Sequence, residues 1–275
     1  MDYYKSVLDY FKNDFLKTDV FISKYALENE LPEQMFERLA KELYRIESTY
    51  ENALSYERIL ELLKDFKHLI LGGSNLFGIG NNKTFVSLSN CFYINNYSDS
   101  YAGILKLDEE MAQAMKRRGG VGIDISHLRP KGFKVNNAAK TSSGAVSFMH
   151  RFSNTTREVA QDGRRGALML SIDINHPDVM DFIKIKRDLT KVTGANISIK
   201  LNKEFMEAVE KDEDYILRYP CDLDLSKFTK EYVKANYNEL HYIEDHTNNN
   251  EVCYVKTIKA KEYWDEIIKS AHGVA

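Results

Sequence analysis

The first 70 residues place apolar side chains every three or four positions, which predicts amphipathic helices. The expected helices cover residues 2–17, 32–46 and 56–69. Pro32 suits the first turn of the second helix, and Ser55 is a plausible N-cap for the third. This part of the chain is therefore expected to form a helical packing domain.

From residue 84 onward, strand-like and helix-like patterns alternate along the chain. Strands are expected at 84–94, 121–126, 167–173 and 196–201, and helices at 101–117, 143–159, 175–186, 202–211 and 259–271. Such alternation predicts parallel strands joined by helical crossovers, so the fold class is α/β. Residues 212–256 are polar and acidic with a run of three Asn, and are expected to form a surface excursion.

Composition narrows the function classes. The chain has 275 residues, is 43% hydrophobic and carries a net charge of −3. These values fit a globular protein and disfavour a broad nucleic-acid surface. The sequence contains neither a signal-peptide pattern nor an apolar run of membrane-spanning length, so a cytoplasmic location without membrane contact is expected. The three cysteines have no zinc-binding spacing, and no metal site is predicted.

Two glycine- and arginine-containing segments are candidates for binding an anion. Gly119 and Gly120 lie between a predicted helix and a predicted strand, where glycine permits positive φ and close approach to a ligand. The alternative is a helix C-cap followed by a tight turn. Gln161, Arg164 and Arg165 lie in a Gly-flanked turn that can offer bidentate donors to phosphate, or can simply be a solvated turn.

Three single residues have both a structural and a functional interpretation. Asp99 precedes a predicted helix and is either its N-cap or an acceptor for a ribose hydroxyl. Cys91 lies on a predicted apolar strand and is either a small buried side chain or a redox thiol. His176 is expected to be structural. The sequence has no HExxH, GxSxG or P-loop motif.

The order of six segments is more specific than any one of them. These segments are SLSNC at 87–91, DSYAGI at 99–104, RGGVGIDISHLRPKG at 118–132, SSGAVSFMHRFSNTT at 142–156, QDGRRGALMLSIDINHPDVMDFIKIK at 161–186 and NISIKLNKEFMEAV at 196–209. Together they resemble the large chain of ribonucleotide reductases, and FISKYALENE at 21–30 resembles that family's N-terminal helical domain. The residues of these segments are most similar to those of the adenosylcobalamin-dependent branch.

The resemblance implies a fold and a division into domains. The family fold is a ten-stranded α/β barrel built from two five-stranded parallel halves. The expected strands supply only the first half, so residues 1–83 are expected to form the helical domain and residues 84–275 the first half of the barrel.

The resemblance also implies roles for individual residues. Cys91 matches the barrel thiol that is oxidised to a disulfide as substrate is reduced. The residues expected to contact the substrate are Ser74, Ser89, Asn90, Gly119 and Gly120. Those expected to contact or report a dNTP or ATP effector are Asp99, Arg129, Gln161, Arg164 and Arg165. Arg129 to about Asn137 matches the first specificity loop, and Gln161, Arg164 and Arg165 lie in the second.

The reaction implied is the radical reduction of a ribonucleoside di- or triphosphate to its 2′-deoxy form. A thiyl radical removes the 3′ hydrogen, the 2′ hydroxyl leaves as water, and a cysteine pair supplies two electrons. The radical source is expected to be adenosylcobalamin or, failing that, a radical-generating metal subunit. The expected partners are the missing half of the barrel, a thioredoxin- or glutaredoxin-type reductant, and a second copy in a homodimer.

The radical cysteine of the family is expected beyond Ala275, so this chain alone is expected to be inactive. The alternative is a non-catalytic nucleotide-binding or assembly module that pairs with a second chain.

Overall fold

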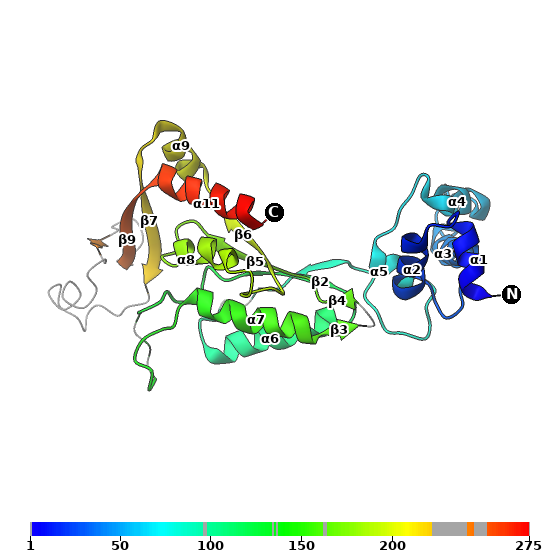
Figure 1. Cartoon of the computed structure of the whole chain (residues 1–275), viewed down its shortest axis with the longest axis horizontal. Coiled ribbons are helices and arrows are strands. Elements are labelled where there is room, and N and C mark those ends of the chain that lie inside the picture. The colour runs from blue at the N-terminus through cyan, green and yellow to red at the C-terminus, as the bar shows by residue number, and fades with distance from the viewer. Residues whose placement is uncertain are drawn as a thin grey trace. The chain divides into compact units, whose positions relative to one another are not determined.

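A computed structural model describes residues 2–95, 98–133, 135, 137–161, 164–221, 241–244 and 252–274. The helices among them are α1 (Tyr3–Tyr10), α2 (Phe15–Lys24), α3 (Pro32–Glu47), α4 (Tyr56–Leu63), α5 (Gly73–Gly78), α6 (Tyr101–Met115), α7 (Ala145–Glu158), α8 (Val179–Lys184), α9 (Lys203–Lys211) and α11 (Ala260–Val274). The strands are β1 (Cys91–Tyr93), β2 (Gly120–Asp124), β3 (Ala160–Gln161), β4 (Arg164–Arg165), β5 (Leu168–Asp173), β6 (Asn196–Lys200), β7 (Asp214–Cys221), β8 (His241–Glu244) and β9 (Val252–Lys259). Figure 1 shows their course along the chain.

The chain forms two compact units whose segments alternate along the sequence. The first comprises Met1–Tyr93, Glu109–Val121 and Thr156–Ala167, and the second comprises Ile94–Asp108, Gly122–Thr155 and Leu168–Ala275. Each unit combines separate segments, whereas the predicted boundary between residues 83 and 84 divides the chain at one position. That boundary stays a prediction. No helix in the described ranges combines the length and the apolarity needed to cross a membrane.

The predicted N-terminal helices are present, with an apolar core between them. Nine buried residues form this core: Val7, Phe21, Met35, Phe36, Leu39, Ala40, Ile59, Leu63 and Leu76. The predicted helix beginning at Pro32 is confirmed as α3, and Ser55 caps α4 by accepting from the backbone N–H of Arg58 at 3.2 Å.

Two of the predicted helices are shorter than their periodicity suggests. Residues 2–17 form two helices, because Lys12 and Asn13 adopt positive φ and the Asp14 side chain caps α2 by accepting from the Lys17 N–H. The third helix ends as an α-helix at Leu63, and a short 3₁₀ turn, Lys64–Phe66, follows with Asp65 at φ 59°. The apolar periodicity continues through both breaks, whereas the helical backbone conformation does not.

The predicted parallel sheet with helical crossovers is confirmed. Four strands lie in the order β1-β2-β5-β6, and β5 pairs with β6 in parallel register from Met169↔Asn196 to Asp173↔Lys200. Each pair of consecutive strands is joined through a helix: α6, α7 and α8 in turn. Buried residues alternate along the two central strands, β2 and β5, as expected where one face of each strand packs against covering helices.

The predicted strand 84–94 is wrong over most of its length. Only Cys91–Tyr93 is a strand, and the residues before it have irregular backbone with local side-chain hydrogen bonds, such as Ser89 N–H to Ser87 Oγ at 3.0 Å. Phe85 and Leu88 are exposed, so the alternation of apolar residues there does not mark a buried face. A strand needs a neighbour for its backbone groups, and β2 supplies one only to the last residues of this segment.

The described parts of the predicted surface excursion belong to a separate antiparallel sheet. β7, β9 and β8 are antiparallel in that order, with Tyr215 opposite Ile258 and Tyr242 opposite Tyr254. Tyr215 and Leu217 are buried, and the Tyr215 ring lies 5.2 Å from the Phe205 ring of α9, so this part of the excursion packs within the second unit. Residues 222–240 and 245–251 of the excursion lie outside the described residues.

Candidate functional site

Four of the predicted substrate residues meet at the beginning of β1 and β2. Asn90 directly precedes β1, and its backbone carbonyl accepts from Gly120 N–H at 2.7 Å. Its side-chain oxygen accepts from the backbone N–H of Ser74 at 3.1 Å. Ser74 is fully buried and donates through its hydroxyl to the Arg118 carbonyl at 2.8 Å. The structure therefore brings Ser74, Asn90, Gly119 and Gly120 together, and their contact with substrate stays a prediction.

Glycine is required around Asn90 for close packing. A Cβ on Gly72 would lie 2.3 Å from the Asn90 amide nitrogen, and one on Gly119 would lie 2.6 Å from the Phe92 ring. Positive φ is found at Arg118, at 71°, whereas neither Gly119 nor Gly120 adopts it. The expectation that these glycines supply positive φ is therefore wrong, and close approach accounts for Gly119.

The position of Cys91 bears on one of its two interpretations, and its redox role stays a prediction. The thiol is free and exposed at the first residue of β1, which is an edge strand of the four-stranded sheet. An exposed side chain cannot be a small buried hydrophobe, so the structural interpretation does not hold in this chain. Ser89, two positions earlier, is also exposed. The side chains of Cys221 and Cys253 lie outside the described residues.

A buried ion pair holds the helix that carries Ser74. The Arg38 guanidinium donates to both Glu30 carboxylate oxygens, at 2.6 and 2.9 Å, and to the Leu76 carbonyl at 3.0 Å. It also donates to the Ile79 carbonyl. These carbonyls lie at the end of α5, where helix C=O groups have no intrahelical donor. Arg38 therefore fixes α5, and with it Ser74, and local sequence patterns gave no sign of this role.

Asp99 follows β1 and Arg129 follows β2, and both were predicted to contact an effector. Their side chains lie beside each other in the second unit. Arg129 Nε donates to Asp99 Oδ2 at 2.9 Å, and each side chain is about three-tenths exposed, at 30% and 29%. The N-cap of α6 is Ser100, whose hydroxyl accepts from Gly103 N–H at 3.1 Å. The N-cap interpretation of Asp99 is therefore wrong, and its carboxylate faces Arg129.

The second predicted effector segment forms a short hairpin in the first unit. β3 and β4 are antiparallel, with Ala160 opposite Arg165 and Gln161 opposite Arg164. The side chains of Gln161, Arg164 and Arg165 lie outside the described residues, so their predicted contacts stay a prediction. Gly166 follows the hairpin, and a Cβ there would lie 3.0 Å from the Thr156 carbonyl, which makes glycine the residue that fits.

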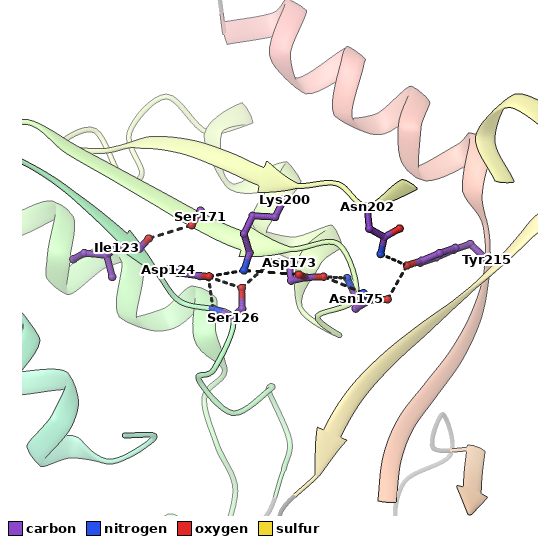
Figure 2. A network of polar contacts seen from close by, with 9 residues as sticks. All are labelled: Ile123, Asp124, Ser126, Ser171, Asp173, Asn175, Lys200, Asn202 and Tyr215. Atoms are coloured by element: carbon purple, nitrogen blue, oxygen red, sulfur yellow. Dashed lines mark hydrogen bonds and ion pairs between the residues drawn. The ribbon is translucent and has the colours of Figure 1, made fainter. Parts of the chain in front are cut away.

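A polar network that sequence reasoning missed lies at the carboxyl ends of three parallel strands, as Figure 2 shows. Asp124 ends β2, Asp173 ends β5 and Lys200 ends β6. The Lys200 ammonium contacts Asp124 at 2.5 Å and Asp173 at 3.8 Å. Burial alone would raise the pKa of Asp124, but hydrogen bonds from Lys200 and Ser126 outweigh it and lower that pKa. The Lys200 ammonium therefore bridges the Asp124 and Asp173 carboxylates across the sheet.

The network continues to β7 through amide side chains. Asn175 donates to Asp173 and accepts from the Tyr215 hydroxyl at 2.9 Å, and Asn202 donates to the same hydroxyl at 2.7 Å. Burial raises the pKa of Tyr215, so the hydroxyl stays protonated and can donate. The available signal was a polar residue at the end of each successive strand, because carboxyl ends of parallel strands share one edge.

Replacing Tyr215 with phenylalanine tests this network. We expect Tyr215→Phe to lower the free energy of unfolding by about 1–2 kcal/mol, because the amides of Asn175 and Asn202 lose a partner in a partly buried place. Urea denaturation measures the change. The matched control is Tyr4→Phe, which removes an exposed hydroxyl bonded to Asp19 and should cost about 0.5 kcal/mol or less. Equal losses would contradict a role for the network.

Comparison with known proteins finds similarity to ribonucleotide reductases. The family model for the ribonucleotide reductase barrel domain matches residues 89–275. The chain is 34% identical over 190 residues to a vitamin B12-dependent ribonucleoside-diphosphate reductase of Thermoplasma acidophilum, covering 68% of this chain and 21% of that protein. It is 31% identical over 185 residues to the protein of the same name from Mycobacterium tuberculosis, covering 65% and 26%.

A ribonucleoside-diphosphate reductase large subunit from Trypanosoma brucei brucei aligns over more of the chain. It is 27% identical over 252 residues, covering 88% of this chain and 28% of that protein. The chain thus spans less than a third of the length of these curated relatives.

Proposed function

Because the chain belongs to the ribonucleotide reductase family, we propose that it supplies the first half of the catalytic barrel and the effector-specificity site of a ribonucleotide reductase. Residues 84–275 form the barrel part of this proposal, and residues 1–83 form the helical domain before it. The reaction of the whole protein is the reduction of ribonucleotides to 2′-deoxyribonucleotides.

Cys91 is proposed as one of the two thiols that reduce the substrate. When a pair of thiols forms a disulfide, each gives up one electron and one proton, and the ribose 2′ hydroxyl leaves as water. The exposed position of Cys91 at the start of β1, directly after Asn90, suits such a thiol. Ser74, Ser89, Asn90, Gly119 and Gly120 are proposed to line the substrate beside it.

The observation that carries the nucleotide-binding part of the proposal is the contact of Asp99 with Arg129. Their sequence positions are 30 residues apart, yet Arg129 Nε lies 2.9 Å from Asp99 Oδ2. A carboxylate accepts from ribose hydroxyls and a guanidinium donates to phosphate, so the pair presents both groups that a nucleotide requires. Gln161, Arg164 and Arg165 are proposed to report the bound effector to the substrate.

The cofactor of the whole enzyme is proposed to be adenosylcobalamin, because two relatives 31–34% identical are named vitamin B12-dependent. Histidine is one residue type that can ligate cobalt, so the buried His176 is the natural residue to test. Its Nδ1 accepts from Asp178 N–H and its Nε2 bonds the Leu128 carbonyl, so neither nitrogen is available as a ligand. His176 therefore does not fit a cobalt ligand.

Thermal unfolding with added dTTP, dATP or dGTP tests the effector site. Binding to the folded state alone adds about 2.7 kcal/mol of stability at a hundredfold excess over the dissociation constant, so the melting midpoint should rise. Asp99→Ala and Arg165→Ala should abolish the rise, whereas Arg45→Ala, which alters an exposed ion pair in α3, should retain it. A cooperative melt that no nucleotide shifts would contradict effector binding by this chain.

A further inference from the structure

The loop that carries Arg129 has two stems that pair with each other. Gly132 N–H donates to the Ser142 carbonyl at 2.9 Å, and Ser142 N–H donates to the Phe133 carbonyl at 2.7 Å. The Ser142 hydroxyl also donates to the Arg129 carbonyl at 3.2 Å. The position of Arg129 therefore depends on how the base of this loop is held.

One carboxylate binds both stems. Asp178, which directly precedes α8 and is 7% exposed, accepts from Lys131 N–H at 3.1 and 3.2 Å. It also accepts from Ala145 N–H, at the first residue of α7, at 2.9 Å. An ionised carboxylate forms stronger hydrogen bonds to backbone N–H groups than a neutral acceptor does. Asp178 thus fastens the start and the end of the loop at one point.

The stem residue Gly144 shows how closely this contact is built. Its φ is +89°, a conformation that side chains rarely adopt. An added Cβ would lie 2.6 Å from Asp178 Oδ2 and 2.8 Å from the Lys131 Cβ. Any larger residue at position 144 would therefore push the carboxylate away from the stems.

His176 orients Asp178 and reaches the residue before Arg129. Its Nδ1 accepts from the Asp178 backbone N–H at 3.0 Å, so the ring proton lies on Nε2, which donates to the Leu128 carbonyl at 2.9 Å. Burial lowers the pKa of His176 and keeps the ring in this neutral form. The expectation that His176 is structural agrees with these contacts. Through them, His176 supports the loop that carries Arg129.

We infer that Asp178, oriented by His176, is a positioning residue that closes the base of the effector loop and holds Arg129 opposite Asp99. The inference rests on the proposed effector site. Asp178 acts on the nucleotide only through the loop.

The test is the dissociation constant of dTTP for the wild-type chain and for Asp178→Asn, measured by calorimetry well below the melting temperature. Asparagine keeps one acceptor oxygen but loses the charge and the second acceptor, so we expect dTTP to bind about tenfold more weakly. Asp178→Ala, which removes both acceptors, should weaken binding further. A graded loss between Asn and Ala is what a positioning carboxylate predicts.

Two controls separate positioning from general loss of stability. Asp188→Asn removes a carboxylate that accepts from Thr190 N–H in an exposed turn, and Tyr215→Phe is expected to destabilise the same unit. Both should leave the dTTP dissociation constant unchanged, because neither side chain bonds the loop. Unchanged dTTP binding in Asp178→Asn would overturn the inference.

Amide hydrogen exchange measures the base of the loop even if the wild-type chain binds no nucleotide. That result would contradict the proposed effector function but would leave the loop itself to be measured. Faster exchange at Lys131 and Ala145 in Asp178→Asn would support the closure of the loop base, and unchanged exchange would overturn it. Gly144→Ala, which displaces the carboxylate without removing it, should give the same faster exchange.

Discussion

Replacing Arg38 with alanine is expected to lower the free energy of unfolding by about 3–5 kcal/mol, because it leaves the Glu30 carboxylate charged and buried. The two side chains are 13% and 8% exposed, so water cannot replace the lost guanidinium freely. The carbonyls of Leu76 and Ile79 lose their donor in the same substitution. Urea denaturation followed by circular dichroism measures the loss.

The matched control for Arg38 is Arg45, which lies on the same helix. Its partner Glu42 is 2.9 Å away, but the Arg45 side chain is 66% exposed. An exposed ion pair of this kind contributes about 0.5 kcal/mol or less, so Arg45→Ala should be nearly neutral. If the two variants lost the same stability, the Arg38–Glu30 pair would not hold α5. A loss confined to Arg38→Ala would support the Arg38–Glu30 pair as a contact that fastens α5 to α3.

The elements predicted best from the sequence are those whose ends carry local signals. α3 begins at Pro32 and α9 is capped by Asn202, whose side-chain oxygen accepts from Phe205 N–H at 2.7 Å. Both the cap and the helical periodicity lie within a few neighbouring residues, so sequence inspection can find them. The parallel order of strands also followed from the alternation of strand and helix patterns.

The wrong elements are those in which a non-local partner decides the structure. The segment 84–94 alternates like a strand, but only its last residues, from Asn90 to Ile94, lie beside β2. Residues 212–256 were expected to form a polar surface excursion, yet β7 and β9 pair along eight residues. Pairing with a distant segment satisfies the backbone N–H and C=O groups of β7, whereas most of residues 84–94 have no such partner. No local sequence pattern reveals which segment will be paired.

The same reason limits the site. Asp99 and Arg129 were expected to act together only because of a family resemblance, and local residue patterns gave no distance between them. Lys200 and Asp124 are 76 residues apart in sequence, and Asp178 and Lys131 are 47 apart. Strand topology brings each pair together, so residues that position the effector loop become visible only in the folded chain.

Phe182→Ala is expected to cost about 3–5 kcal/mol, because a fully buried phenyl ring is removed from a helix of six residues. α8 buries only Val179, Phe182 and Ile183, so the Phe182 ring supplies a large part of the apolar surface by which this helix packs. The helix follows directly after Asp178, and a loosened α8 should also weaken dTTP binding by this chain. Denaturation and calorimetry on the same variant measure the two effects.

The control is Leu189→Ala, which truncates an apolar side chain that is 74% exposed just beyond the end of this helical segment. It should change stability by about 0.5 kcal/mol or less and leave dTTP binding as it is. Stability lost in Phe182→Ala without any change in dTTP affinity would mean that Asp178 holds the loop independently of α8. Loss of both would mean that the packing of α8 determines where the carboxylate lies, so that one buried ring supports the effector site from a distance.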